Sequence, residues 1–268
     1  MPIIDSHCFI GRWVDENVHS STKELLDSMK KTGVSRSVVM TTNRGCNSYV
    51  RKIVRNHLKS FFFAYWFDPR LPSSLPNLKH FHELGEVALV KVHPSHLRVR
   101  LDDERMKPVL EFCSETRLPL LVHCGRWVEM SGYKIALKMA EKFPRLNFFL
   151  AHMGGVDRTL RMKTIKEVYE RSITNAYLVT SGPISTKKGV DLLYAPRTCP
   201  PEIIEFAVDR VGSDHVVFGS DFPFGLQSEI LKCIELAKVT GWQREDMLWR
   251  NAARLLFGRR LEKPSKAL

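Results

Sequence analysis

The first apolar run of the chain ends in groups that can carry chemistry. Residues 3–11 read Ile-Ile-Asp-Ser-His-Cys-Phe-Ile-Gly, so a short buried strand leads into an acid, a histidine and a loop-opening glycine. Three later apolar runs end in the same way, at His123, His152 and Asp221. The carboxyl ends of parallel strands meet at one edge of a sheet. His7, His123, His152 and Asp221 are therefore expected to converge there.

Helical segments alternate with these runs along the whole chain. Strands are predicted at residues 3–7, 37–41, 61–67, 87–92, 118–122, 146–152, 176–180 and 215–220. Nearly continuous apolar strands between helices indicate a covered parallel sheet. A single-domain (β/α)₈ TIM barrel of the α/β class is the simplest such arrangement, and a length of 268 residues is typical of it. The barrel is predicted over residues 1–258, with a C-terminal tail at 259–268. An open, doubly wound sheet is the alternative, but no glycine-rich phosphate loop follows the first strand.

The charge pattern bears on the choice of partners. The net charge is +12 and the calculated pI is near 9.5, which raises the question of a polyanionic partner. The basic residues are spread along the chain as short pairs such as Lys30-Lys31, with no long block. This pattern predicts a solvated basic surface and no nucleic-acid binding.

Hydropathy and cysteine content indicate the setting of the protein. No apolar run approaches the roughly 20 residues that span a bilayer, and no secretory signal is expected because Asp5 and His7 interrupt the first run. The six cysteines form no CxxC pair, so reduced thiols are expected. A cytoplasmic protein that has a small-molecule substrate and contacts no membrane is predicted. Whether the substrate is anionic and whether the chain forms a homodimer stay open.

Imidazoles and a carboxylate at one sheet edge suit metal chemistry. Together they favour a borderline divalent ion such as zinc, with one coordination position left for water. Such an ion lowers the pKa of bound water to about 7, which makes hydroxide available at neutral pH. A shared metal or acid–base site is therefore the favoured interpretation of the four residues. The remaining histidines, except His93, are interpreted as structural: His19, His57, His80, His82, His96 and His215.

Six short motifs carry a family resemblance. They are IIDSH at 3–7, KVHP at 91–94, LVHCG at 121–125, LAHMGG at 150–155, FGSDFP at 218–223 and NAARLLFG at 251–258. With these motifs in this order, the chain resembles the amidohydrolase superfamily. The similarity is to the branch that includes aminocarboxymuconate-semialdehyde decarboxylase and resorcylate-type decarboxylases beside many hydrolases.

The resemblance implies roles for individual residues. His7, His123 and Asp221 would hold one divalent ion, with zinc expected. His152 would hydrogen-bond the reacting water or the substrate, so His152 and Asp221 are the predicted catalytic residues. Lys91 ends the predicted fourth strand, where binuclear members of the superfamily carry a bridging carboxylated lysine. In this branch a substrate contact or a core ion pair is the expected role of Lys91, and His93 and Cys124 are candidates for supporting positions.

Phe9 departs from the family pattern. Family hydrolases begin with His-x-His, and here the second histidine position holds phenylalanine. The site could use fewer histidines together with Asp5, Cys8 or water; it could bind weakly or bind a different ion; or it could have lost metal and catalysis. A retained but altered metal site is favoured.

The predicted substrate carries a carboxylate or carbonyl group. Basic residues fall in several predicted loops, and a guanidinium is a good carboxylate clamp: Arg12, Arg44, Arg70, Arg98, Arg126 and Lys187. Arg126, three residues past His123, is the preferred candidate, and Trp13 and Trp127 could stack on a planar substrate. The predicted function is a metal-dependent hydrolase acting through metal-activated water. A non-oxidative decarboxylase and an inactive barrel that binds a ligand or a protein are the alternatives.

Overall fold

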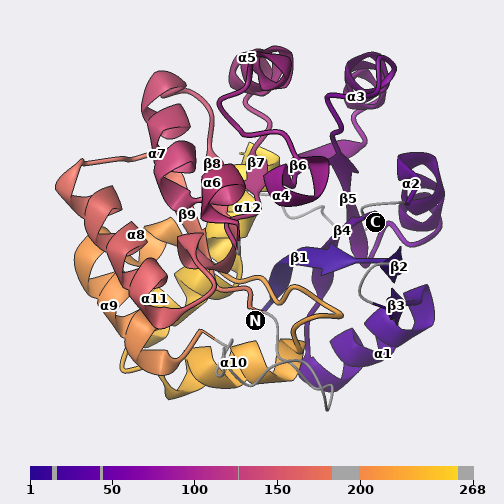
Figure 1. The fold of residues 1–268 in the computed structure, drawn as a ribbon. Helices are drawn as coiled ribbons and strands as arrows, with labels where there is room; N and C mark the ends of the chain where they lie inside the picture. The colour runs from indigo at the N-terminus through magenta and orange to yellow at the C-terminus, as the bar shows by residue number, and fades with distance from the viewer. Residues whose placement is uncertain (14–16, 43–44, 126, 183–198, 259–268) are drawn as a thin grey trace.

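The computed structural model describes residues 1–13, 17–42, 45–125, 127–182 and 199–258. Within these ranges, eight parallel strands form one sheet in chain order, which confirms the predicted (β/α)₈ barrel (Figure 1). The strands are β1 (Ile4–Phe9), β4 (Arg36–Met40), β5 (Phe61–Trp66), β6 (Val87–Val92), β7 (Leu120–Val122), β8 (Phe148–Leu150), β9 (Ala176–Val179) and β10 (Val216–Val217).

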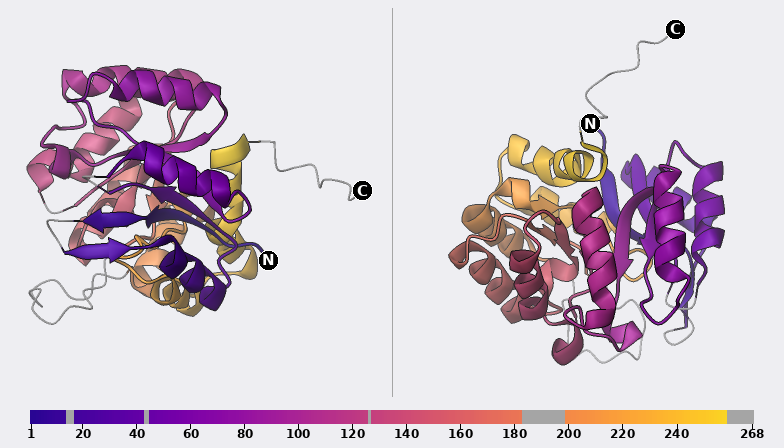
Figure 2. Two further views of the ribbon diagram at one scale, coloured as in Figure 1. Left: turned by 90° about the vertical axis from the view of Figure 1, so that its right-hand side faces the viewer. Right: turned by 90° about the horizontal axis from the view of Figure 1, so that it is seen from above.

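Helices cover the outside of the sheet, as two further views show (Figure 2). The longer ones are α1 (Thr22–Thr32), α2 (Asn47–Asn56), α3 (Ser74–Glu83), α5 (Lys107–Thr116), α7 (Tyr133–Lys142), α8 (Arg158–Glu170), α9 (Pro201–Val211) and α10 (Gln227–Leu236). The shorter ones are α4 (Pro94–Leu97), η1 (Glu104–Met106), α6 (Val128–Ser131), η2 (Ala151–Gly154), η4 (Ser213–His215), α11 (Gly241–Glu245), η5 (Asp246–Arg250) and α12 (Asn251–Phe257). An antiparallel pair that was not predicted, β2 (Gly11–Trp13) and β3 (Val18–Ser20), follows β1. No helix in the described ranges is long and apolar enough to cross a membrane.

Helix α1 shows how local sequence sets an element. The hydroxyl of Ser21 accepts a hydrogen bond from the amide of Glu24, and the Glu24 carboxylate accepts from the amide of Ser21. This reciprocal cap fixes the start of the helix, whose first residue is Thr22. Gly33 ends α1 with a φ of 74°, in the left-handed region that glycine adopts without strain.

Side chains on alternate faces of the strands form two apolar layers. The inner cluster, defined here, comprises Ile4, Phe9, Trp13, Val38, Met40, Ala64, Trp66, Leu89, Leu121, Phe149, Ala151, Tyr177, Val179, Val217, Ala252, Ala253 and Leu255. Ile4 and Phe9 both belong to it although they are an odd number of positions apart. The register shift between Asp5 and Cys8 makes this possible, because one extra residue reverses the alternation. Cys8 consequently faces the outer layer, against the helices.

The barrel closes where β1 meets the chain that follows β10. The amide of Ser6 donates to the carbonyl of Phe218 at 3.0 Å, and the amide of Asp221 donates to the carbonyl of His7 at 2.8 Å. Gly219 permits the close approach, because a Cβ there would lie 2.5 Å from Val179 and 3.1 Å from Cβ of His7. Closure thus joins the two ends of the sequence and sets His7 beside Asp221.

Asp5 anchors this closure. Its fully buried carboxylate accepts hydrogen bonds from the amide of Ser220 at 2.9 Å, the hydroxyl of Ser220 at 2.6 Å and the side-chain amide of Gln227 at 2.9 Å. A fourth bond comes from the amide of His7 at 3.1 Å. Burial raises the pKa of Asp5, and the bonds from Ser220 and Gln227 oppose that rise. Four donors on one carboxyl group make Asp5 a structural residue.

Several predicted boundaries need correction. Strand β8 ends at Leu150, and His152 lies in η2 with a φ of 59° instead of ending a strand. Strand β10 contains only two residues, so Asp221 lies four positions beyond it. The predicted tail at 259–268 lies outside the described residues, and the domain boundary at 258 stays a prediction.

Replacing Asp5 should destabilise the fold strongly. We expect Asp5→Ala to lower the free energy of unfolding by about 3–5 kcal/mol, because several buried donors lose one charged acceptor. Asp27→Ala, at the exposed ion pair with Lys23 on α1, is the matched control and should have a far smaller effect. Urea unfolding of the three proteins measures both. Equal losses in the two variants would contradict the anchoring role of Asp5.

Candidate active site

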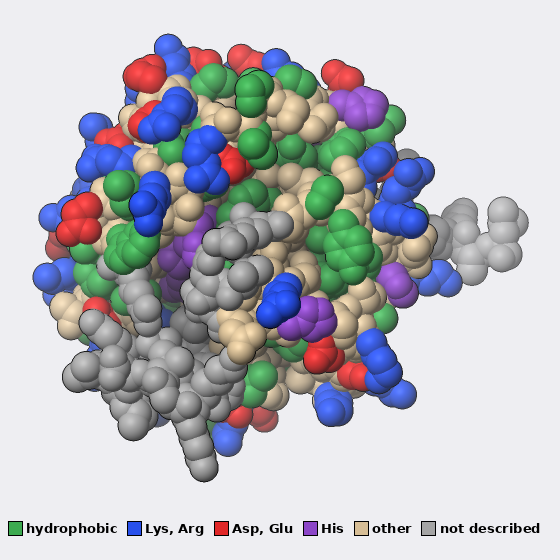
Figure 3. Space-filling model, turned by 45° about the vertical axis from the view of Figure 1, so that its right-hand side comes forward, with side chains coloured by type: hydrophobic (Ala, Val, Ile, Leu, Met, Phe, Trp, Pro, Cys, Tyr) green, Lys and Arg blue, Asp and Glu red, His purple; other side chains and the backbone are tan. Residues whose placement is uncertain are grey.

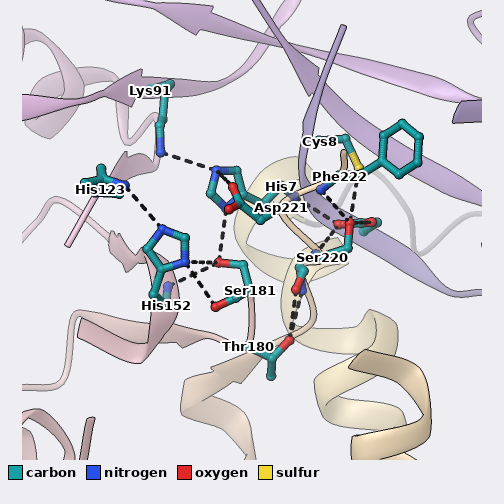
Figure 4. Close-up of polar contacts among 12 residues, drawn as sticks. His7, Cys8, Lys91, His123, His152, Thr180, Ser181, Ser220, Asp221 and Phe222 are labelled. Atoms are coloured by element: carbon teal, nitrogen blue, oxygen red, sulfur yellow. Dashed lines mark hydrogen bonds and ion pairs between the residues drawn. The ribbon is translucent and has the colours of Figure 1, made fainter. Parts of the chain in front are cut away.

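Four polar side chains lie at the carboxyl end of the barrel interior, and strand alternation directs Lys91 at the end of β6 and His123 directly after β7 to this place. Each follows an inner-cluster residue by an even number of positions: Lys91 after Leu89, His123 after Leu121, Ser181 after Val179 and Asp221 after Val217. His7, two residues before the inner-cluster residue Phe9, joins them, and the close-up shows these residues and His152 around one space (Figure 4). The predicted convergence of His7, His123, His152 and Asp221 is what the structure shows.

His7 contacts three other side chains of the site. Its Nε2 lies 3.2 Å from Oδ1 of Asp221 and 3.3 Å from Nζ of Lys91. Its Nδ1 lies 3.1 Å from the hydroxyl of Ser181, and the side chain is fully buried. When Nε2 carries the proton it donates to Asp221, and when Nδ1 carries it Nε2 accepts from Lys91. Both nitrogens of His7 are therefore engaged inside the protein.

His152 is held by a strained turn. His152 and Met153 have φ values of 59° and 51°, in the left-handed region that residues other than glycine seldom adopt. The buried Arg161 of α8 stabilises this turn by donating to the carbonyls of His152 and Gly155. The turn places Nδ1 of His152 3.1 Å from the carbonyl oxygen of Ser181.

His123 and His152 pair with each other. Nε2 of His152 lies 3.2 Å from Nδ1 of His123. The Nε2 of His123 lies against Gly125, where an added Cβ would come within 2.1 Å of it. His93 stacks on His123, with ring centroids 3.7 Å apart and an interplanar angle of 13°. His93, considered only as a supporting residue from the sequence, thus fixes the plane of the His123 ring.

Ser181 is a site residue that the sequence analysis missed. Its hydroxyl contacts Nδ1 of His7 and accepts from the backbone amide of His152, so it connects the two histidines. It lies just beyond β9, and the rule that located His123 would have located it. A serine after an apolar run is common, so the signal was overlooked.

Burial sets the charges in the site. Desolvation lowers the pKa of His7, His93 and His123 well below the usual 6.5, and it lowers the pKa of His152 to about 3. Desolvation also lowers the pKa of Lys91 to about 8, while the charge of Asp221 opposes this. At neutral pH the four imidazoles are neutral and Lys91 is the cation of the cluster. Neutral His152 can accept or donate one hydrogen bond, but it does not supply a proton as imidazolium.

Phe9 stands where the family pattern has the second histidine of His-x-His, and its ring lies in an aromatic cluster. Its ring centroid lies 5.2 Å from that of His7, 5.1 Å from that of Trp13 and 6.5 Å from that of Trp66. The Nζ atom of Lys91 lies 5.8 Å from the centroid of the Phe9 ring. Phe9 therefore offers the site an aromatic face and no lone pair.

The predicted metal can be tested against this geometry. The described residues contain no group of three or more His, Cys, Asp or Glu side chains arranged to hold a metal ion. His7 and Asp221 contact each other and Lys91, whereas His123 is turned to His152. As arranged, these donors do not fit a bound ion. The assignment of His7, His123 and Asp221 as ligands stays a prediction.

The other candidates have different surroundings. Asp5 and Cys8 are candidate substitute ligands by sequence. Asp5 accepts hydrogen bonds at the barrel closure, and Cys8 packs in the outer apolar layer. Among the predicted clamps, Arg70 is paired with Asp68 at 2.6 Å, and Arg126 lies outside the described residues, as do Arg44 and Lys187. Trp13 is buried against Phe9, and Trp127 is half exposed. His123 is only partly buried, and histidine side chains reach the surface on the face that Figure 3 shows.

The buried histidines should make the fold sensitive to mild acid. Their pKa values are lower in the folded than in the unfolded chain, so below about pH 6.5 the unfolded chain binds protons that the folded chain does not. Stability should therefore fall from pH 7 to pH 5.5, by up to about 1.4 kcal/mol per pH unit for each histidine. The raised pKa of Asp5 acts in the opposite direction, but it is one group against four. Urea unfolding at the two pH values measures this, and equal or greater stability at pH 5.5 would contradict it.

Comparison with known proteins places this site in a family. The amidohydrolase family model matches residues 7–258. The 2-amino-3-carboxymuconate-6-semialdehyde decarboxylase of Caenorhabditis elegans is 28% identical over 117 residues, which cover 42% of this chain and 28% of that protein. The match therefore spans little more than a quarter of the relative.

Solved structures share the fold at low identity. The 5-carboxyvanillate decarboxylase of Sphingomonas paucimobilis has a TM-score of 0.71 at 16% identity, covering 95% of this chain and 98% of that one. A dihydroxybenzoic acid decarboxylase from Polaromonas, with bound manganese, has a TM-score of 0.71 at 16% identity, covering 97% and 98%. An amidohydrolase from Burkholderia multivorans, with bound zinc, has a TM-score of 0.74 at 13% identity, covering 96% and 99%. Two of these three structures contain a divalent metal. By the near-complete match of the family model, this chain belongs to the amidohydrolase family, which is a family of enzymes.

Proposed function

We propose that the chain catalyses the non-oxidative decarboxylation of a small, conjugated or aromatic carboxylate. The observation that carries this proposal is the fully buried ammonium of Lys91, set between His7, Asp221 and the Phe9 ring among neutral imidazoles. The relative from Caenorhabditis elegans and two of the solved structures bear the names of decarboxylases, which supports the same reaction class.

Decarboxylation needs groups that this cluster offers. When CO₂ leaves, the C–C bond breaks and its electron pair stays on the substrate carbon. A preorganised positive charge in a water-poor site lowers the energy of that carbanion. In the proposed step Lys91 stabilises the pair and transfers one proton from Nζ to the carbon. The neutral amine then takes a proton from water, which restores the starting state.

The neighbours of Lys91 have supporting roles in this proposal. Asp221 keeps Lys91 protonated before the substrate binds, because its negative charge raises the pKa of the lysine. In this proposal, Nε2 of neutral His152 exchanges its contact with His123 for a hydrogen bond that orients the substrate. Arg126 stays the preferred clamp for a second anionic group of the substrate, as predicted from its position after His123.

Hydrolysis by a water molecule that a bound zinc ion activates is the other candidate, and it is the function predicted from the sequence. Family membership favours it, and it requires one ion held by His7, His123 and Asp221. The described donors, which engage one another and Lys91, do not support that arrangement. Decarboxylation is preferred because the proposed step uses the ammonium of Lys91 and requires no activated water.

Turnover in heavy water separates the two reactions. We expect a panel that includes 2,6-dihydroxybenzoate and 5-carboxyvanillate to yield CO₂ and a product with one deuterium at the carbon that lost it. Mass spectrometry and CO₂ detection measure this. Hydrolysis of an ester or amide panel without CO₂ release would contradict the proposal.

Two substitutions test the assigned roles. Lys91→Met keeps the length of the side chain but removes its charge, and it should lower kcat by about 100-fold or more, or about 2.7 kcal/mol. His152→Asn should also remove most activity. His80→Asn, on the outer helix α3, is the matched control and should leave kcat unchanged. Wild-type kcat in folded Lys91→Met would exclude the lysine as the essential cation.

A further inference from the structure

We propose that Lys91 and Phe9 together exclude a divalent ion from this site, so that the barrel holds a built-in cation at the position predicted for the ion. This exclusion concerns binding and applies whichever reaction the chain catalyses. Three observations support it: the position of Lys91 beside His7, the absence of a metal-binding side chain at position 9, and the burial of Lys91.

The ammonium of Lys91 lies beside the predicted ligands. Nζ of Lys91 lies 3.3 Å from Nε2 of His7, and that same nitrogen lies 3.2 Å from Oδ1 of Asp221. The lone pair that Nε2 directs to Lys91 is the one that a metal ion would take. The close-up shows Lys91 pointing to His7, which lies beside Asp221 (Figure 4).

Position 9 holds phenylalanine in place of the histidine of the family pattern. A histidine there would add a lone pair to the predicted ligand set, whereas Phe9 contributes only a ring face. The negative face of an aromatic ring attracts a cation within about 6 Å, and Nζ of Lys91 lies 5.8 Å from the ring centroid. Phenylalanine in place of histidine at position 9 therefore weakens metal binding and favours an ammonium beside the ring.

Lys91 is also confined to the interior of the barrel. Lys91 is fully buried in β6, where its neighbours Val90 and Val92 pack into the outer layer. Because the side chain is fully buried and points away from this layer, its charge lies inside the site. A divalent ion beside His7 and Asp221 would meet this charge at close range, and repulsion would oppose its binding.

Restoring one ligand alone should therefore fail. In the full-length chain, freed of metal by a chelator and then dialysed, we expect wild type and Phe9→His to bind no stoichiometric zinc. Phe9→His/Lys91→Met removes the competing charge and adds the donor, and it should bind one zinc ion at least 100-fold more tightly than wild type. Calorimetric titration with zinc chloride measures affinity and stoichiometry, and a zinc-dependent rise in Tm confirms binding to the folded chain.

Two controls locate the effect. Phe9→His/Lys107→Met carries the same kinds of change, but the lysine lost is an exposed one on α5, so it should behave like Phe9→His. Adding His7→Asn to the Phe9→His/Lys91→Met protein should abolish the gained zinc binding, which assigns the ion to this site.

Several outcomes would overturn the proposal. One equivalent of zinc, manganese or another divalent ion in purified wild type, lost in His7→Asn, would show that the lysine does not exclude a metal. Zinc binding by Phe9→His as tight as that of the double variant would show the same. A folded double variant that binds no zinc would show that Lys91 is not what keeps the ion out. Elemental analysis of wild type needs no variant, so the proposal stays testable if a variant misfolds.

Discussion

The closure of the barrel between β1 and the chain after β10 is the contact on which the site depends. Backbone hydrogen bonds from Ser6 to Phe218 and from Asp221 to His7 join the two ends of the described barrel. The carboxylate of Asp5 stabilises this closure by accepting hydrogen bonds from the side chains of Ser220 and Gln227. The bulge in β1 then turns Phe9 into the interior while Cys8 faces the helices. One structural carboxylate thus fixes the position of a histidine, a carboxylate and an aromatic ring.

Burial at this join determines the electrostatics. Imidazoles that lose solvent and lie near a lysine give up their proton, so His7, His123 and His152 are neutral groups at pH 7. An unpaired buried ammonium would be unfavourable, and Lys91 is stabilised by Asp221, by His7 and by the face of Phe9. The arrangement sets one ammonium and the carboxylate of Asp221 among neutral imidazole rings. That charge distribution is the main chemical property of the site.

The sequence predicted the barrel and most of the site because both rest on local patterns. Apolar runs ending in polar residues placed His7, His123 and Asp221, and the alternation of side chains about Leu89 would have turned Lys91 inward as well. Contacts between strands were beyond such patterns. The engagement of Lys91 with His7, the pairing of His123 with His152 and the role of Ser181 depend on which strands are neighbours and how far each side chain reaches. The left-handed turn at His152 was also hidden, since Arg161 and the glycines that permit it follow the strand.

The replacement of an ion by an ammonium and the proposed reaction class support each other on physical grounds. A divalent ion binds water and lowers its pKa to about 7, so it prepares hydroxide for hydrolysis. An ammonium has no vacant coordination position and does not generate hydroxide. It does carry a fixed charge and donor hydrogens, which are what a developing carbanion or enolate requires. A site that exchanges the ion for Lys91 therefore loses the means of activating water and keeps the means of stabilising negative charge. Loss of CO₂ from a carboxylate requires stabilisation of the carbanion and a proton donor, and it requires no activated water.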